Sequence, residues 1–250
     1  MELLQSRDII DYRNRLRAKG VSPPTVNLLV SKIVSAPLRA AARQGIERNP
    51  AAGIQRLLNR GKHRKLPFSI EETCKLLAVA SEEWRGMILC AYSTGARLGD
   101  AASLQWSDVD VTNGVVTIFQ RKTQTQVIVG LHADFQDWLD KQNVKEGPVF
   151  PNLIGRGSSG KGGLCFQFAD LMKRAGVTPE VIRTKSGGGR RVFSKYFHSF
   201  RHHAASAIFK SKLIEQTQRA VTGHAGEAVR RYTHHDLEAV KAASSLIPRI

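Results

Sequence analysis

Residues 114–131, GVVTIFQRKTQTQVIVGL, contain two runs of β-branched residues separated by a polar segment. Such runs predict two strands joined as an antiparallel hairpin. Most of the remaining chain has apolar residues at helical spacing, together with residues that typically start and stop helices. A small antiparallel sheet within a mainly helical chain therefore predicts an α+β fold.

The first part of the chain, residues 7–62, is predicted to be entirely helical. Its first helix ends at Gly20, a residue type that commonly terminates helices. Ser22 is followed by two prolines, which is typical of the start of a second helix. Pro37 is expected to break or kink that helix, because proline donates no backbone hydrogen bond. Beyond it we predict another helix, a turn at an asparagine–proline pair, and a short final helix.

The basic stretch 59–69, NRGKHRKLPFS, contains glycine, proline and few apolar residues, so we place a domain boundary within it. The boundary divides the chain into residues 1–62 and residues 63–250. The second domain is expected to hold further helices around the hairpin, the first of which begins with a capping box. Residues 236–247 have apolar positions at helical spacing and predict a helical tail.

The charge of the chain restricts its partners. It has 38 Lys and Arg against 21 Asp and Glu among 250 residues, which gives a net charge of +17. This excess favours a polyanion, since neutralising phosphates releases counterions. A merely soluble basic protein is the alternative, and charge alone distinguishes neither DNA from RNA nor an enzyme from a binding protein. The sequence has no apolar stretch of membrane-spanning length and no secretory leader, which predicts a soluble intracellular protein.

Two familiar site patterns are incomplete in this chain. Gly155–Gly162, GRGSSGKG, resembles a phosphate-binding P-loop but has glycine where the magnesium-binding Ser or Thr belongs, so we interpret it as a surface loop. Cys74, Cys90 and Cys165 are far apart and form no CxxC pair. They indicate reduced thiols rather than a disulfide framework or a zinc ribbon.

His198 and His202 lie four residues apart and would share one helix face, as a zinc-binding pair does. The glutamate of an H-E-x-x-H motif is absent. Arg201 projects from nearly the same face, where a cation opposes a divalent ion. Acidic residues are scarce in residues 184–231, whereas a two-metal nuclease needs several. The sequence therefore argues against a metal site.

A phosphate site explains more of these residues together. His198 and Arg201 are three residues apart and project from one helical turn. Arginine can donate two hydrogen bonds to phosphate oxygens, and histidine can donate to the phosphate or transfer a proton near neutral pH. His224 precedes Tyr232 by about two helical turns. The tyrosine hydroxyl has a high ordinary pKa, so it needs neighbouring cations and a base to attack at neutral pH.

Two further cations would complete a site for phosphate transfer. Arg97 would share the charge of a pentacoordinate phosphorane, and Asp100, three residues later, would hold it in place. Lys122 at the hairpin tip would protonate a departing alkoxide. Taken singly, each residue also has a structural alternative. Arg97 could be a surface helix residue and Lys122 a solvated turn residue. His224 could cap a helix, and the ring of Tyr232 could be half-buried packing.

In chain order these residues resemble the catalytic pattern of the tyrosine recombinases, the phage-integrase and Xer-type family: Arg97, Lys122, His198, Arg201, His224 and Tyr232. YSTGARLGDAASLQWSDVD resembles the family's first arginine motif, and RKTQTQVIVGL its β-hairpin lysine motif. HSFRHHAAS is similar to its H-x-x-R box, and TGHAGEAVRRYTHHD to the segment with the second histidine and the nucleophile. VSPPTVN and AARQGIERNPA resemble its helical core-binding domain, so the likeness spans nearly the whole chain.

The resemblance implies a site-specific DNA recombinase. The nucleophile Tyr232 would attack a DNA phosphate, form a 3′-phosphotyrosine and free a 5′-hydroxyl, without metal, ATP or another cofactor. The remaining residues of the pattern would bind the phosphate (Arg97, Arg201, His224), assist proton transfer (His198) and act as general acid (Lys122).

Tyr196 lies two residues before His198 and is the alternative nucleophile. Its surroundings, VFSKYFHSF, are aromatic and lead into a helix, which indicates a ring used for packing.

The resemblance also implies partners. These are double-stranded DNA recombination sites, a homotetramer that passes through a Holliday junction, and accessory directionality factors. The tail helix resembles one that docks on a neighbouring protomer, and packing on its own domain is the alternative. The protein would come from a bacterium, an archaeon or a phage and act in the cytoplasm at the nucleoid. Basic residues near the domain boundary, the hairpin and a second basic segment are expected to contact DNA: Lys62, Arg64, Lys65, Arg121, Lys185, Arg190 and Arg191.

The chain departs from the family pattern in three ways. Members usually begin with more residues, often an arm-binding domain, so we expect the N-terminal domain to be incomplete. Asp100 stands where glutamate is more usual, and Pro37 falls where the family tends to run a continuous helix. Three other functions remain open: a type IB topoisomerase-like enzyme with the same chemistry, a non-catalytic DNA-binding protein, and a histidine–metal nuclease.

Overall fold

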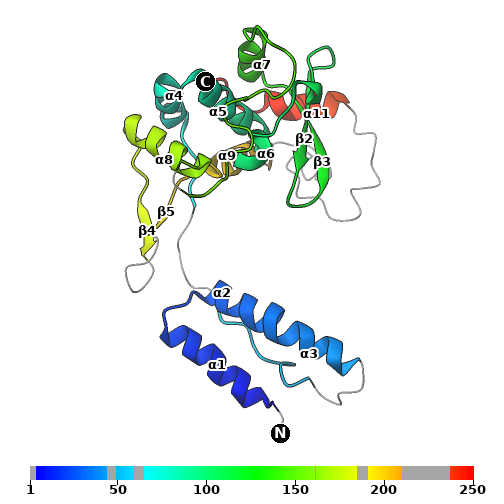
Figure 1. Ribbon diagram of the computed structural model, residues 1–250, viewed down its shortest axis with the longest axis vertical. Helices are drawn as coiled ribbons and strands as arrows, with labels where there is room; N and C mark the ends of the chain where they lie inside the picture. The colour runs from blue at the N-terminus through cyan, green and yellow to red at the C-terminus, as the bar shows by residue number, and fades with distance from the viewer. Residues whose placement is uncertain (1–3, 44–48, 59–64, 161, 185–190, 210–236) are drawn as a thin grey trace. The chain divides into compact units, whose positions relative to one another are not determined.

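The structure, a computed structural model, is mainly helical with small antiparallel sheets, as predicted (Figure 1). It describes residues 4–43, 49–58, 65–160, 162–184, 191–209 and 237–250. The chain divides into two compact units, residues 1–64 with 181–192 and residues 65–180 with 193–250. Among the helices described, none is both long and apolar enough to cross a membrane.

The first unit is built on four consecutive helical segments. These are α1 (Ser6–Ala18), α2 (Pro23–Leu28), the π-helix η1 (Leu29–Val34) and α3 (Ser35–Ala42). The predicted break at Pro37 is wrong, since helical residues run without interruption from Pro23 to Ala42. Pro37 lies in the first turn of α3, directly after the π-helix η1, so the change of helix type stands where the missing proline donor falls.

The prediction of a short final helix in the first unit is wrong. Residues 51–53 form a turn and residues 54–58 have no regular structure. The side chain of Asn27 supplies the backbone hydrogen bonds instead, since Oδ1 accepts from Leu57 N at 2.8 Å and Nδ2 donates to Leu57 O at 2.9 Å. The segment packs against a small apolar core formed by Ile9, Val26, Val30 and Ala51.

The second unit is organised around α5 (Glu82–Thr94), in which every residue from Gly86 to Thr94 is buried. A helix that is apolar on all sides belongs inside a protein. Helices α7 (Ala133–Asp140) and α9 (Ser199–Phe209) pack against it. A Cβ at Gly86 would lie 2.5 Å from the ring of Trp138, so glycine permits the close approach of α7.

Helix α4 (Ile70–Val79) begins with the predicted capping box and packs against α8 (Leu164–Arg174). Ser69 Oγ accepts from Glu72 N at 3.1 Å, and Glu72 Oε2 accepts from Ser69 N at 2.8 Å. The box satisfies two backbone donors at the helix start.

The predicted hairpin is confirmed as part of a three-stranded antiparallel sheet, which contacts α6 (Leu98–Ala101) through β2. Its strands are β1 (Val109–Asp110), β2 (Val115–Gln120) and β3 (Thr125–Gly130), in the order β1-β2-β3. The 3-10 turn η2 (Trp106–Asp108) and helix α6 precede the sheet in the chain.

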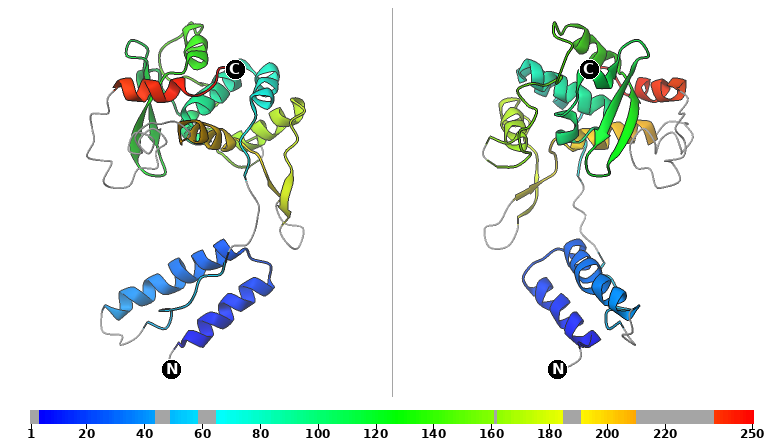
Figure 2. Two further views of the ribbon diagram at one scale, coloured as in Figure 1. Left: turned by 180° about the vertical axis from the view of Figure 1, so that it is seen from behind. Right: turned by 45° about the vertical axis from the view of Figure 1, so that its right-hand side comes forward.

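Helix α11 (Leu237–Ser245) packs on β3 of its own unit (Figure 2). A Cβ at Gly130 would lie 2.8 Å from Lys241 Cα and 2.8 Å from Ser244 Oγ. Glycine at the end of β3 therefore lets the helix backbone approach the sheet. Ser244 Oγ donates to Gly130 O at 2.7 Å and fixes the contact.

A second, two-stranded sheet was not expected from the sequence. It consists of β4 (Val181–Thr184) and β5 (Arg191–Phe193), which flank the glycine-rich basic segment. At its base, Ser194 N donates to Glu180 O at 2.8 Å, and Ser194 Oγ accepts from Glu180 N at 3.0 Å.

Candidate active site

The loop after α5 determines where Arg97 stands. The helix ends at Gly95, whose φ of 66° is left-handed and whose N–H donates to Ala91 O at 2.9 Å. Thr94 Oγ1 then accepts from Ala96 N at 3.1 Å, which fixes the turn. Arg97 follows in an extended conformation as the N-cap of α6. The side chain of Arg97 therefore projects from a tight turn that hydrogen bonds hold in place.

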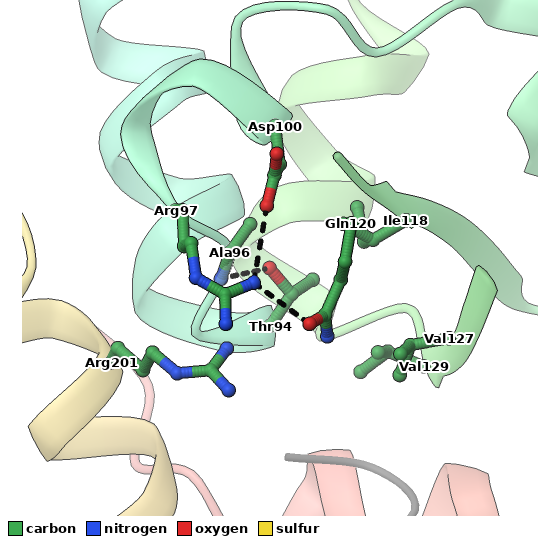
Figure 3. A pocket seen from close by; sticks show the side chains of 9 residues that line it. All are labelled: Thr94, Ala96, Arg97, Asp100, Ile118, Gln120, Val127, Val129 and Arg201. Carbon is green, nitrogen blue, oxygen red and sulfur yellow. Dashed lines mark hydrogen bonds and ion pairs between the residues drawn. The ribbon is translucent and has the colours of Figure 1, made fainter. Parts of the chain in front are cut away.

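Two acceptors hold the guanidinium of Arg97 on one side (Figure 3). Its Nη1 donates to Gln120 Oε1 at 2.7 Å and to Asp100 Oδ2 at 3.4 Å. Among the described residues, none accepts a hydrogen bond from its Nε or Nη2. The arginine is thus oriented through Nη1, and no described residue engages the rest of its planar fork.

Arg201 reaches the same place from α9. Its side chain is buried, and Nη1 donates to Gly95 O at 3.1 Å. Burial and, to a smaller extent, the nearby charge of Arg97 lower the pKa of Arg201 to about 10, while Asp100 opposes both effects. The guanidinium still carries its charge at neutral pH. Two like charges kept together at a cost in free energy are suited to an anion that relieves the repulsion.

Arg97 and Arg201 line one pocket, with their guanidinium groups facing each other (Figure 3). Among the described residues that line it, Asp100 is the only acid, and Gln120 adds a neutral amide. The remaining lining is apolar or hydroxylic: Thr94, Ala96, Ile118, Val127 and Val129. Two cations against one carboxylate give this lining a net positive charge, which favours an anion.

Lys122 lies at the tip of the β2–β3 hairpin, outside the residues that line this pocket. The turn from Arg121 to Gln124 is exposed, and Gln124 has a φ of 53°, the left-handed value that closes the turn. Arg121 N donates to Asp100 Oδ1 at 3.3 Å. The carboxylate beside Arg97 therefore also holds the residue before Lys122.

His198 lies directly before α9, and its backbone carbonyl accepts from Arg201 N at 3.1 Å. Its ring stacks on Tyr196 with centroids 5.9 Å apart and meets His202 edge-on at 5.4 Å. Burial, together with the charges of Arg201 and Lys65, lowers the pKa of His202. The lowered pKa favours the neutral form of His202 at neutral pH, so the cations near it are Arg201 and Lys65.

The ring of Tyr196 packs as predicted, but only in part. It stacks on His198 and carries Lys65 Nζ at 4.5 Å from its centroid, yet it remains 39% exposed. Burial of the hydroxyl raises its pKa, which makes it a weaker nucleophile. Tyr92, the tyrosine of α5, is buried in the core.

The structure thus gathers part of the predicted site. It brings Arg97, Asp100 and Arg201 into one pocket, with Lys122 on the adjoining turn and His198 beside Arg201. His224 and Tyr232 lie outside the described residues. Sequence reasoning missed Gln120, because a polar residue at a strand end reads as a surface position. Only its predicted strand, which alternates between a buried and an exposed face, could have indicated that it points inward.

The predicted DNA contacts are only partly described. Arg121 and Arg191 are exposed, and Lys65 is half-buried. The other four, Lys62, Arg64, Lys185 and Arg190, lie outside the described residues. In the part of the chain that the structure describes, no group of three His, Cys, Asp or Glu side chains lies together as metal ligands would.

The sequence profile of the phage integrase family matches residues 67–238. Among curated proteins, the tyrosine recombinase XerC of Xanthomonas axonopodis pv. citri is 26% identical over 187 residues. This alignment covers 70% of this chain and 56% of that protein, so the chain spans a little over half the length of this relative.

Two solved structures have the same fold. The Tn1549 transposon integrase in complex with transposon right end DNA aligns with a TM-score of 0.65 and 17% identity, covering 96% of this chain and 84% of that one. The lambda integrase tetramer bound to a Holliday junction aligns with a TM-score of 0.60 and 19% identity, covering 94% of this chain and 67% of that one.

Proposed function

The chain belongs to the phage integrase family, and from this premise we propose that it is a site-specific DNA recombinase. In this proposal it cleaves and rejoins DNA through a covalent 3′-phosphotyrosine, without metal or ATP. The observation that carries the proposal is the pocket in which Arg97 and Arg201 face each other with one carboxylate, that of Asp100, beside them. A diester phosphate carries the one negative charge that this arrangement lacks.

The proposed first step is an in-line displacement at phosphorus. The Tyr232 oxygen attacks as its proton passes to a nearby base, the bond from phosphorus to the 5′-oxygen breaks, and that oxygen takes a proton from Lys122. Arg97, Arg201 and His224 bind the nonbridging oxygens, which gain charge in the transition state. His198 assists proton transfer. Since the phosphotyrosine conserves the energy of the phosphodiester bond, a 5′-hydroxyl of a second strand can reverse the step with no added cofactor.

The structure supports the division of labour between the two arginines. Arg97 is held by its Nη1, so its Nε and Nη2 are oriented as a fork towards a ligand. Arg201 is fixed by the Gly95 carbonyl in a buried position, where water screens its charge poorly. Arg97 is therefore suited to bidentate binding, and Arg201 to stabilising developing charge at short range.

We extend the proposal to the partners of the chain. Double-stranded DNA would be bound by a core-binding domain, residues 1–62, and by a catalytic domain, residues 63–250. Four copies would exchange strands through a Holliday junction, and accessory factors would set direction. The lambda integrase tetramer on a Holliday junction has the same fold and supports this assembly. Exposed Arg121 and Arg191, with Lys65, would contact DNA, together with Lys62, Arg64, Lys185 and Arg190.

A selection for covalent adducts tests the proposal and finds the target sequence in the same experiment. The protein is incubated in EDTA with randomised duplexes that carry nicks, because a nick lets the short strand diffuse away and traps the cleaved state. DNA still attached after denaturation in SDS is sequenced, and the enriched sequence is called the selected duplex. The protein is then run with this duplex on a denaturing gel beside Tyr232→Phe and Tyr196→Phe.

We expect a covalent band for the wild type and for Tyr196→Phe, and none for Tyr232→Phe. DNA bound in a native gel without any covalent band would contradict the proposal and favour a binding protein. A free cleaved strand that disappears in EDTA would contradict it in favour of a metal nuclease.

A further inference from the structure

Gln120, at the end of β2, is a buried polar side chain in the pocket lined by Arg97 and Arg201, which we call the phosphate pocket. It is 3% exposed, and its Oε1 accepts from Arg97 Nη1 at 2.7 Å, a shorter bond to this arginine than the one from Asp100 at 3.4 Å (Figure 3). A buried amide is costly unless it is hydrogen-bonded, and a bond to a charged donor is stronger than a neutral one. Gln120 is therefore a second acceptor, beside Asp100, that orients Arg97.

The same amide oxygen also reaches the hairpin turn. Thr123 Oγ1 lies 3.4 Å from Gln120 Oε1 and 2.7 Å from Thr125 Oγ1. Thr123 N donates to Gln120 O at 3.2 Å. Gln120 is thus bonded through one oxygen to Arg97 and to the residue that follows Lys122.

Asp100 makes the corresponding connection on the other side of the lysine. One carboxylate oxygen contacts Arg97 Nη1, and the other accepts from Arg121 N at 3.3 Å. The neighbours of Lys122 on both sides are therefore tied to the two groups that hold Arg97. Since the turn is exposed, these bonds rather than burial set its orientation.

We propose that Gln120 is a positioning residue that couples the phosphate-binding Arg97 to the turn that carries Lys122. The inference rests on the proposed function, in which Arg97 binds the scissile phosphate and Lys122 protonates the leaving oxygen. When a phosphate engages the open side of Arg97, the guanidinium is held against Gln120, and the amide in turn holds the lysine turn in register with the leaving group.

The choice of an amide has a physical reason. Gln120 gives Arg97 a second acceptor without a second negative charge, so the pocket keeps its excess of cations. A glutamate would bind Arg97 as well, but it would neutralise the pocket and repel the phosphate. Gln120→Glu is therefore expected to preserve the melting temperature while lowering cleavage.

A substrate with sulfur in place of the bridging 5′-oxygen separates the two effects. A thiolate leaves without protonation, so a defect that acts through the general acid disappears on the sulfur substrate, whereas a defect in phosphate binding remains. Cleavage rates are measured on the oxygen and sulfur forms of the selected duplex. Lys122→Ala and Arg97→Ala serve as references: we expect loss of roughly 10²-fold or more on oxygen alone for the first, and an equal loss on both substrates for the second.

Gln120→Met keeps the side-chain volume and removes the acceptor. We expect a loss of about 10-fold or more on the oxygen substrate and a loss at least ~3-fold smaller on the sulfur substrate, because only the part transmitted to Lys122 is bypassed. Thr123→Val, at an exposed position that does not threaten the fold, should lose about 3-fold on oxygen and nothing on sulfur.

An equal loss for Gln120→Met on both substrates would overturn the inference, since Gln120 would then serve Arg97 or the fold alone. No loss on either substrate would overturn it as well. These results differ from a failure of the proposed function, in which the wild type itself forms no covalent adduct on either substrate.

Discussion

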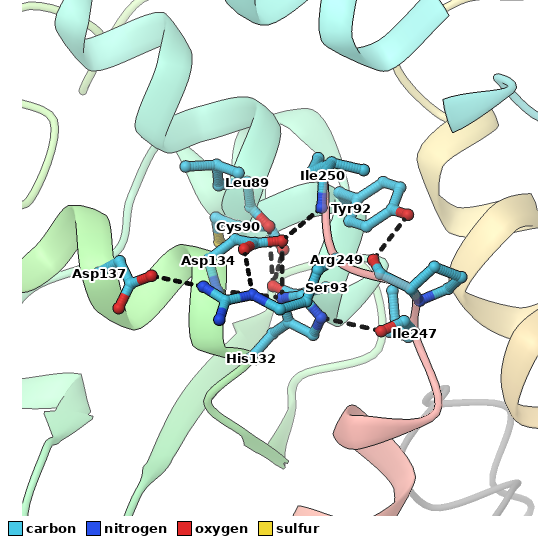
Figure 4. Close-up of polar contacts among 11 residues, drawn as sticks. Leu89, Cys90, Tyr92, Ser93, His132, Asp134, Asp137, Ile247, Arg249 and Ile250 are labelled. Atoms are coloured by element: carbon cyan, nitrogen blue, oxygen red, sulfur yellow. Dashed lines mark hydrogen bonds and ion pairs between the residues drawn. The ribbon is translucent and has the colours of Figure 1, made fainter. Parts of the chain in front are cut away.

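Two polar networks lie beside helix α5, and each contains an arginine that contacts at least one carboxylate. In the first, the pocket lined by Arg97 and Arg201, Asp100 contacts Arg97 at 3.4 Å (Figure 3). In the second network, which we call the clasp, Arg249 contacts Asp134 at 2.8 Å and Asp137 at 2.5 Å (Figure 4). The pocket thus has more cations than anions, and the clasp has more anions than cations.

The clasp binds residues 247–250 to the rest of the second unit. His132 Nε2 contacts Ile247 O at 2.9 Å, Tyr92 Oη donates to Pro248 O at 3.0 Å, and Ile250 N donates to Asp134 Oδ2 at 2.8 Å. In the clasp, the hydrogen-bond acceptors are main-chain carbonyls and the carboxylates of Asp134 and Asp137. Each of these acceptors is paired with a donor of the same protein.

The pKa shifts of the two arginines point in opposite directions. The hydrogen bond and the charge of Asp134 raise the pKa of Arg249, while burial and the charge of Arg97 lower that of Arg201. A cation stabilised by its own protein needs no ligand, whereas a cation placed at a cost next to another cation gains from one. The difference agrees with a structural role for the clasp and a ligand-binding role for the pocket.

The largest difference between the two networks is expected when Arg97 in the pocket and Arg249 in the clasp are each replaced by alanine. Arg97→Ala should lower the rate of covalent adduct formation on the selected duplex by about 10³-fold, since a donor to the developing charge is lost. Arg249→Ala should leave that rate within about twofold, because its charge is engaged in the clasp. Comparable losses for both variants would show that the charge balance of a network does not identify its role.

Gly130→Ala tests the end of the sheet that carries α11 without touching the pocket. The added Cβ would meet Lys241 Cα and Ser244 Oγ at 2.8 Å, so α11 must shift, at a cost of about 1–3 kcal/mol in the free energy of unfolding. Chemical denaturation measures this loss. Gly99→Ala, which meets nothing within 4 Å and lies in α6, is the matched control and should unfold as the wild type does or slightly later.

Tyr92→Phe removes one bond of the clasp and keeps the packed ring. The variant loses the donor to Pro248 O, and we expect a loss of about 1 kcal/mol in the free energy of unfolding, with normal adduct formation. Loss of the covalent adduct in this variant would contradict the assignment of Tyr92 to structure.

The smallest expected effect is a dependence of stability on pH through His202. Burial and two nearby cations hold its pKa in the folded state below the unfolded value. As pH falls below about 6.5, the unfolded chain therefore takes up a proton before the folded chain, and stability is lost in that range. His202→Gln should flatten the decline of the melting temperature between about pH 7 and pH 5. If the melting temperature of His202→Gln declined as it does in the wild type, titrating groups other than His202 would be responsible for the pH dependence.

The sequence predicted the elements whose patterns are local. The β2–β3 hairpin follows from alternating β-branched residues around a polar tip, and the capping box of α4 from Ser69 and Glu72. The prediction of a short final helix in the first unit was wrong because Asn27, far away in the sequence, binds the backbone of Leu57. Strands β4 and β5 were missed because each is short and the segment between them is rich in glycine.

The candidate site divides in the same way. Arg97, Lys122, His198 and Arg201 could be proposed because their order and spacing resemble a family pattern. The contacts that position them could not, since they join distant segments: the carbonyl of Gly95 meets Arg201, and the amide of Gln120 meets Arg97. Periodicity predicts which face of an element is buried, but it does not predict which buried group meets which.

The central claim is that Tyr232 attacks a phosphate held by this pocket, and mapping the covalent adduct tests it most directly. The adduct with the selected duplex is digested with nuclease and trypsin, and the peptide that retains a nucleotide is identified by mass spectrometry. Trypsin separates the candidates, since Tyr232 falls in YTHHDLEAVK and Tyr196 in YFHSFR. We predict the nucleotide on YTHHDLEAVK, linked through its 3′-phosphate to the tyrosine. A nucleotide on YFHSFR, or on a residue other than tyrosine, would contradict the account.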